Sequence, residues 1–345
     1  MAMVLCALAG LGCAHGVVVQ RPLFRGYEAI SLRNGAARVT VVPGIGRVTE
    51  FVMLKDGERG PVWVNPALAP GLAADASGWS NFGGEKTWPA PQDDWGKVTG
   101  KDWPPPKTFD ATPFSETITD GVIEIASAVD PAYGLQVRRR IWLDPALPVL
   151  TIETRYEKVQ GSPVSVGVWT IAQLAPPERM FVRLPEPSVF PGGFRNKMPA
   201  PPRELRVEGR LLSMARDPAQ KTQIATDGDA LLWVGEGPDL LVEALDDPGG
   251  KPGPGLSPWA RESQEYPSIR GPKPKPSTRS ELDWPGGVHA QLYTNPDGEQ
   301  RYVELELLGR LHRLGPGDSA RFTVRYTLIP RSEADPMREA RKVLP

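Results

Sequence analysis

The most informative segment of the sequence is Asn81-Phe82-Gly83-Gly84-Glu85-Lys86-Thr87-Trp88-Pro89-Ala90-Pro91-Gln92-Asp93-Asp94-Trp95. Adjacent glycines let a backbone turn sharply and let a ligand approach closely, and prolines stiffen a loop so that less entropy is lost on binding. Indole rings offer flat apolar faces that suit stacking on the C–H face of a sugar ring. The composition therefore predicts a loop that forms the wall of a binding site. The alternative is a tryptophan-rich loop that only caps one end of a sheet.

If the segment is a site wall, its polar and aromatic side chains are the candidate ligand-binding groups. Within the segment these are Asn81, Gly84, Glu85, Lys86, Trp88, Gln92 and Trp95. A second segment rich in proline and aromatic residues, Trp103-Pro104-Pro105-Pro106, is expected to form the opposite lip, with Trp103 in contact with the ligand.

On both sides of this segment the sequence alternates apolar and polar residues with the period of two that is typical of β-strands. Asn34-Gly35 predicts a hairpin, because a type I′ turn needs positive φ at both central residues. The clearest expected strands are 27–32, 37–42, 47–54, 122–128, 135–143, 149–158, 164–174, 230–234, 289–293, 301–308 and 319–329. So many strands with almost no helix predict an all-β protein built as a large antiparallel sandwich.

The chain divides into a leader, one large domain and a tail. Residues 1–16 are apolar and small and resemble a bacterial secretory signal, and Leu11-Gly12-Cys13 resembles a lipoprotein cleavage box with Cys13 as the lipidated residue. The alternative for this segment is a buried N-terminal strand. We expect a single domain over 17–330, a Pro/Gly-rich insertion at 246–287, and a C-terminal tail at 331–345 with a helical pattern over 333–343. These features predict an extracytoplasmic protein, periplasmic or attached to the outer membrane through Cys13.

Composition disfavours several partners and cofactors. With 40 basic and 41 acidic residues the formal charge is −1, so no global field attracts nucleic acid. Both cysteines fall in the leader, and the three histidines are scattered, so no metal site is expected. No glycine loop precedes a helix to cradle a phosphate, and we predict no cofactor.

Charged residues on two strands have a defined orientation. Glu304 and Glu306 alternate with apolar residues, so both acids lie on one face of their strand. That face could be solvent, or it could line a site where low dielectric raises a carboxyl pKa and suits it to general-base work. Arg138, Arg139 and Arg140 are consecutive, so their side chains point to both faces and at least one is expected to meet the site or a buried acid.

Three motifs together resemble an uncharacterised bacterial domain family related to the galactose mutarotases, or aldose 1-epimerases. They are Asn81 to Gln92, the strand Gly167-Val168-Trp169-Thr170, and the ending Tyr293-Thr294-Asn295-Pro296 followed by Tyr302 to Gly309. The resemblance covers about Tyr27 to Pro330. It implies a galactose mutarotase-like β-supersandwich whose concave sheet binds carbohydrate, with Trp169 and Gln173 of the middle strand at the ligand.

The resemblance also implies a chemistry. Mutarotases use a glutamate base on a late strand and a histidine acid on a middle strand to open and reclose a sugar ring. Glu304 or Glu306 matches the late strand, with Glu304 the better candidate because it directly follows Tyr302-Val303. The middle strand departs from the pattern, because Trp169-Thr170-Ile171-Ala172-Gln173 has no histidine. Lys86 is the remaining candidate for the proton donor or the ring-oxygen partner.

The sequence therefore predicts a monomeric, mutarotase-like protein that recognises a mono- or oligosaccharide. Two alternatives remain open. One is an active epimerase, lyase or other carbohydrate-active enzyme with a glutamate base. The other is a structural protein of the cell envelope that docks a protein partner.

Overall fold

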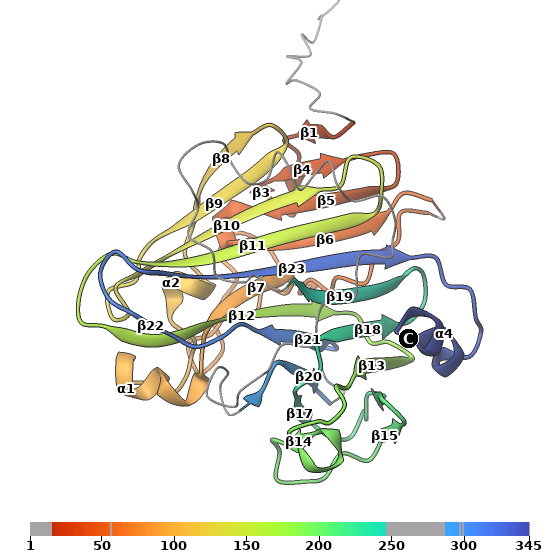
Figure 1. Cartoon of the computed structure of the whole chain (residues 1–345). Coiled ribbons are helices and arrows are strands. Elements are labelled where there is room, and N and C mark those ends of the chain that lie inside the picture. The colour runs from red at the N-terminus through yellow and green to blue at the C-terminus, as the bar shows by residue number, and fades with distance from the viewer. Residues whose placement is uncertain (1–15, 56, 246–286, 297, 299, 345) are drawn as a thin grey trace, which may run out of the picture.

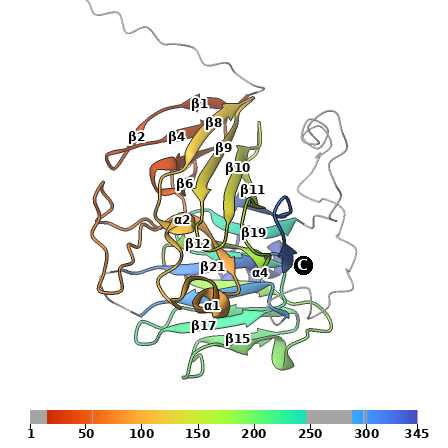
Figure 2. The same ribbon diagram turned by 90° about the vertical axis from the view of Figure 1, so that its left-hand side faces the viewer.

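The computed structural model describes residues 16–55, 57–245, 287–296, 298 and 300–344. Its strands run across the molecule in two layered sheets, which Figure 1 shows from the side and Figure 2 shows along the strands. All strand pairs recorded between named strands are antiparallel, as the sequence predicts.

The first sheet has 11 strands. Their order is β1 (Val18–Gln20), β4 (Ile30–Arg33), β5 (Ala37–Val42), β6 (Arg47–Met53), β7 (Glu85–Ala90), β12 (Val164–Leu174), β21 (Val303–Leu308), β20 (Ala290–Thr294), β17 (Thr222–Thr226) and β14 (Arg195–Asn196), and β22 (His312–Leu314) pairs with β12. Strands from the two ends of the sequence thus meet at its centre, where β12 lies between β7 and β21.

The second sheet has 10 strands. Their order is β15 (Leu205–Glu208), β16 (Leu211–Met214), β13 (Arg179–Arg183), β18 (Ala230–Val234), β19 (Asp239–Leu245), β23 (Ser319–Ile329), β11 (Val149–Lys158), β10 (Leu135–Leu143), β9 (Val122–Val129) and β8 (Ser115–Thr119). A small hairpin of β2 (Leu23–Phe24) and β3 (Tyr27–Glu28) stands apart.

Short helices cover the two ends of the sandwich. At one end lie α1 (Trp95–Thr99) and α2 (Lys107–Asp110), and at the other lies α4 (Pro336–Val343) (Figure 1). The 3₁₀ helices are η1 (Pro43–Ile45), η2 (Gln92–Asp94) and η3 (Pro191–Gly193). The Asp335 side chain caps α4 by accepting from the backbone N–H groups of Met337 and Arg338. The predicted tail helix therefore forms, and its Ala340 is buried in an apolar cluster with residues of β13 and β18. No helix in the described part of the chain has the length and apolar character needed to span a membrane.

The main core fills the space between the two sheets. Alternating side chains of β12, β21 and β20 pack there against those of β10, β11 and β23, for example Leu305 and Leu292 on one side and Ile141 and Ile152 on the other. Because side chains alternate, the next residue on each strand of the first sheet points away from the second sheet. We call that side the outer face.

The Asn81–Trp95 segment differs from the prediction, because its middle part, Glu85–Ala90, is the central strand β7 and not a loop. All six β7 residues are buried, and the strand pairs with β12 from Ala90↔Gly167 to Glu85↔Ala172. Proline is tolerated at position 89 because Val168, opposite it, directs its carbonyl at the N–H of Gly309 on the other side of β12.

The predictions for the leader and the insertion stay predictions. Residues 1–15, with Cys13, and residues 246–286 lie outside the described residues. The described chain begins with Gly16 and continues into β1, which pairs with β4 at the edge of the first sheet.

Candidate functional site

The outer face of the first sheet brings together polar and aromatic side chains from three strands at its centre. Lys86 of β7 lies opposite Ile171 of β12, and Ile171 lies opposite Glu306 of β21. One step along the sheet, Gln173 lies opposite Glu304. Together with Trp169, the residues Lys86, Gln173, Glu304 and Glu306 form what we call the Glu304 site.

Glu304 is the member of the site nearest to solvent. Its Oε1 accepts a hydrogen bond of 2.9 Å from the Nε2 of Gln173 and lies 3.8 Å from the Nζ of Lys86. The residue is 8% exposed, whereas Gln173, Lys86 and Glu306 are completely buried. A ligand that reaches the site therefore meets the Glu304 carboxylate first.

Glu306 lies deeper on the same strand. Its Oε2 accepts a hydrogen bond of 2.9 Å from the Nε1 of Trp169. Its Oε1 has no hydrogen-bond partner among the described residues, and the same is true of Gln173 Oε1 and Lys86 Nζ. Leaving a buried polar atom without a hydrogen-bond partner costs free energy. The three atoms therefore have hydrogen-bonding capacity that no described residue satisfies.

The buried environment shifts the pKa values of Glu304, Glu306 and Lys86. Burial raises the pKa of Glu304, while the Lys86 ammonium and the Gln173 amide oppose that shift. Burial, and after it the charge of Glu304, raises the pKa of Glu306 to about 8. Burial lowers the pKa of Lys86, and the carboxylates of Glu304 and Asp110 oppose it. At neutral pH Glu306 is therefore largely a neutral acid.

Lys86 is held by aromatic rings and not by hydrogen bonds. Its Nζ lies 4.2 Å from the ring centre of Trp88 and 5.3 Å from that of Trp79. Such cation–π contacts stabilise an ammonium that has lost its water. The ammonium therefore occupies one side of Trp88, where the sequence led us to expect a sugar ring.

Trp88 is buried at the centre of a cluster of indoles. Its ring makes edge contacts with Trp79, Trp95, Trp103 and Trp169. Asp110, at the end of α2, accepts the indole N–H bonds of both Trp88 and Trp79 and also pairs with Arg47. With only 5% of its surface exposed, Trp88 positions Lys86 and is not placed to stack on a ligand.

Two residues predicted to bind ligand lie away from the Glu304 site. Glu85 points between the sheets, where it pairs with Arg139 of β10 and accepts a hydrogen bond from Tyr326 of β23. At Gly84 a Cβ atom would lie 2.6 Å from the carbonyl oxygen of Val48, so this glycine allows two backbones to approach and does not admit a ligand.

The remaining predicted site residues lie outside β7, before its first residue or after its last. Gln92 lies in η2, beyond the end of β7. Trp95 is fully buried and donates to the carbonyl of Pro89. Trp103 is partly exposed and donates to Ser77 Oγ. The side chain of Asn81 donates to Gln300 Oε1 at 2.8 Å and accepts from the N–H of Gly83.

Sequence reasoning missed several residues near the site. Asp110 and Trp79 give no periodic signal, because both lie outside the strands of the two large sheets. Trp63, Tyr302 and Tyr293 form a row of rings beside Glu304, with ring centres 4.8 Å apart for Trp63 and Tyr302 and 6.0 Å apart for Tyr302 and Tyr293. The alternation of Tyr302, Glu304 and Glu306 was the one signal that could have found part of this row.

Metal ligands do not gather anywhere in the described residues. His, Cys, Asp and Glu side chains there form no group of three that could hold a metal ion.

Comparisons with known proteins concern the fold. No family model and no curated protein matches this sequence. Among solved structures, a galactose mutarotase-like protein from Lactobacillus casei ATCC 334 is 9% identical over 87% of this chain and 99% of its own, with a TM-score of 0.54. A galactose mutarotase related enzyme from Lactobacillus acidophilus is 11% identical over 89% of this chain and 98% of its own, with a TM-score of 0.50.

A TPR-domain containing protein from Parabacteroides distasonis ATCC 8503 is similar to a comparable degree. It is 13% identical over 89% of this chain with a TM-score of 0.54, and this chain spans 48% of its length. Together these likenesses show that the chain has the galactose mutarotase-like fold, an antiparallel β-supersandwich. The fold class expected from the sequence is thereby confirmed.

Proposed function

We propose that this protein recognises a carbohydrate at the Glu304 site. The observation that carries the proposal is a set of three buried polar atoms without hydrogen-bond partners among the described residues, Lys86 Nζ, Gln173 Oε1 and Glu306 Oε1, in the same site as the carboxylate of Glu304. Sugar hydroxyl groups both donate and accept hydrogen bonds, so a sugar could satisfy donors and acceptors of this kind together. The rings of Trp63, Tyr302 and Tyr293 beside Glu304 add apolar area for the C–H face of a ring.

A Glu304→Gln variant tests the proposal. A hydrogen bond to a charged group contributes about 1.5–3 kcal/mol, so we expect the affinity for a bound sugar to fall at least about tenfold. Binding of a panel of mono- and oligosaccharides is measured by intrinsic tryptophan fluorescence and by calorimetry. Glu243→Gln is the control, since Glu243 pairs with Arg325 on the second sheet, and it should bind as the wild type does. Equal affinity of wild type and Glu304→Gln, or no binding of any sugar, would contradict the proposal.

The second candidate function is proton transfer at the anomeric centre of a sugar. It is favoured by two carboxyl groups that share one face of β21, since the pKa of Glu306 is raised to about 8 while Lys86 and Gln173 oppose the rise in the pKa of Glu304. The Glu304 carboxylate takes the proton of the anomeric hydroxyl as the ring C–O bond breaks, and a neutral Glu306 carboxyl gives its proton to the ring oxygen. The open-chain aldehyde then rotates and recloses by the reverse steps. Lys86 is the alternative proton donor.

Polarimetry of freshly dissolved glucose and galactose tests this candidate. If the protein accelerates mutarotation, loss of the base in Glu304→Gln should remove about 10²- to 10⁴-fold of the acceleration. Glu306→Gln and Lys86→Met then distinguish the donor, because only the variant that lacks the donor loses the acceleration. No acceleration by the wild type would remove the catalytic candidate and leave the binding proposal standing.

A further inference from the structure

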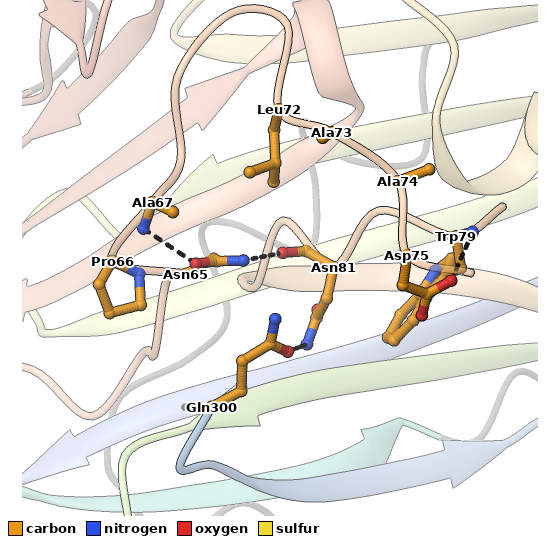
Figure 3. A pocket seen from close by; sticks show the side chains of 10 residues that line it. All are labelled: Asn65, Pro66, Ala67, Leu72, Ala73, Ala74, Asp75, Trp79, Asn81 and Gln300. Atoms are coloured by element: carbon orange, nitrogen blue, oxygen red, sulfur yellow. Dashed lines mark hydrogen bonds between the residues drawn. The ribbon is translucent and has the colours of Figure 1, made fainter. Parts of the chain in front are cut away.

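A cavity of about 310 Å³ opens beside Trp79, at the end of the first sheet (Figure 3). Its polar lining comes from Asn65, Asp75, Asn81 and Gln300, and its apolar lining includes Trp79 and Leu72. This volume lies at the lower end of the range for small-molecule sites in proteins, and it suits a ligand of the size of one sugar unit.

The polar wall of the cavity is fixed by the protein's own hydrogen bonds. Asn65 Nδ2 donates to the carbonyl of Asn81 at 2.8 Å, and Asn81 Nδ2 donates to Gln300 Oε1 at 2.8 Å. Figure 3 shows these amides arranged in a row from Asn65 to Gln300. The Asp75 carboxylate is fixed by Ser77 and by the backbone N–H of Trp79. A wall held in this way loses little further entropy when a ligand binds.

The cavity adjoins the Glu304 site. Trp79 lines the cavity, and the Lys86 ammonium lies 5.3 Å from the centre of its ring. The same ammonium lies 3.8 Å from Glu304 Oε1. The Lys86 ammonium therefore links the Trp79 wall of the cavity to the carboxylate of Glu304.

The lining chemistry narrows the class of ligand. Asp75 is the one charged residue among the described lining residues, and no cation is present there to hold a phosphate or a carboxylate. Three side-chain amides beside an indole and short aliphatic side chains are suited to a neutral ring with hydroxyl groups and apolar C–H faces.

We propose that this cavity is a second sugar subsite, so that the ligand is a neutral oligosaccharide or glycoside with at least two units. One unit lies at Glu304, and the next lies against Trp79 and Gln300. This inference rests on the proposed function, because it extends the ligand of the same site.

Paired binding measurements test the subsite. Glucose and galactose are compared with maltose, cellobiose and lactose, by calorimetry, on the full chain. We expect the best disaccharide to bind at least about tenfold more tightly than its component monosaccharide, which is the effect of one or two added hydrogen bonds. In Gln300→Ala this gain should be lost while monosaccharide affinity stays unchanged. The control Gln136→Ala removes an amide on the second sheet, where it donates to the carbonyl of Ser127, and should keep the gain.

A second variant keeps the test decisive if Gln300→Ala does not fold. Ala74 is exposed on the cavity rim, so Ala74→Trp should fold and fill the cavity, and it too should abolish only the disaccharide gain. If disaccharides bind no more tightly than monosaccharides, or if both variants keep the gain, the subsite proposal is overturned and the Glu304 proposal is not. If no saccharide binds at all, both proposals fail.

Discussion

Replacing Arg139 by methionine is expected to lower the free energy of unfolding by about 3–5 kcal/mol, the cost of leaving one partner of a buried ion pair alone. Arg139 and Glu85 lie between the sheets and are almost completely inaccessible to solvent. One guanidinium nitrogen of Arg139 donates to both oxygens of the carboxylate. Burial raises the pKa of Glu85, and Arg139 is the main group that opposes this shift. Without the guanidinium, the protein must bury an unpaired charge or protonate Glu85.

Equilibrium unfolding in urea at pH 7 measures the effect. The neighbouring residue provides a matched control, because Arg138 points to the opposite face and pairs with Glu124 and Glu157 in partly exposed ion pairs. Arg138→Met should therefore cost no more than about 1 kcal/mol. The double variant Glu85→Leu with Arg139→Met should recover much of the loss, since an apolar pair leaves no charge buried. A loss in Arg139→Met no larger than that in Arg138→Met would refute this account of the pair.

The Glu85–Arg139 pair also shows why most of the strands, but not β7, could be predicted from the sequence. Strands such as β12, Val164–Leu174, are visible because apolar residues recur on the face that meets the other sheet. In β7 both faces carry polar residues, with Glu85 and Thr87 on one side and Lys86 on the other. Their partners Arg139, Tyr156 and Glu304 come from distant parts of the chain, so no local sequence pattern predicts these contacts.

The sequence could predict the part of the candidate site that depends only on the alternation of side chains along a strand. Period two places Glu304 and Glu306 on one face, and the same rule places Trp169 and Gln173 together on the strand that proves to lie beside them. Strand order is what sequence could not supply, and strand order brings Lys86 to Glu304. The Gln300–Asn81 hydrogen bond joins residues 219 positions apart in the sequence. A cavity wall built from such a contact has no signal in a single sequence.

The second large effect concerns pH. Between about pH 5 and pH 8 the wild-type protein is expected to become less stable as pH rises. The pKa of Glu306 is about 8 in the folded chain, well above the ordinary value of 4.5. Between these two values the folded state holds a proton that the unfolded state has released, so raising the pH favours unfolding. The contribution of Glu306 to stability is thus complete below the unfolded pKa and lost as pH rises through the folded pKa. One carboxyl group accounts for at most about 1.4 kcal/mol per pH unit.

Glu306→Gln isolates this contribution, because an amide of similar shape carries no titrating proton. Burial raises the pKa of Asp239 to about 7, so Asp239 also makes the free energy of unfolding fall as pH rises. The decrease in the free energy of unfolding per pH unit should therefore be smaller in Glu306→Gln but not zero, and smaller again when Asp239→Asn is added.

The charged groups that face Glu306 are Glu304, Lys197 and Lys86. Lys86→Met should steepen the wild-type slope, since a cation that favours ionised Glu306 and Glu304 is removed. If urea unfolding at pH 5, 6, 7 and 8 gives the same slope for wild type and Glu306→Gln, Glu306 is already ionised in the folded chain. It could not then be the neutral acid that ring opening needs, and Lys86 would be left as the donor.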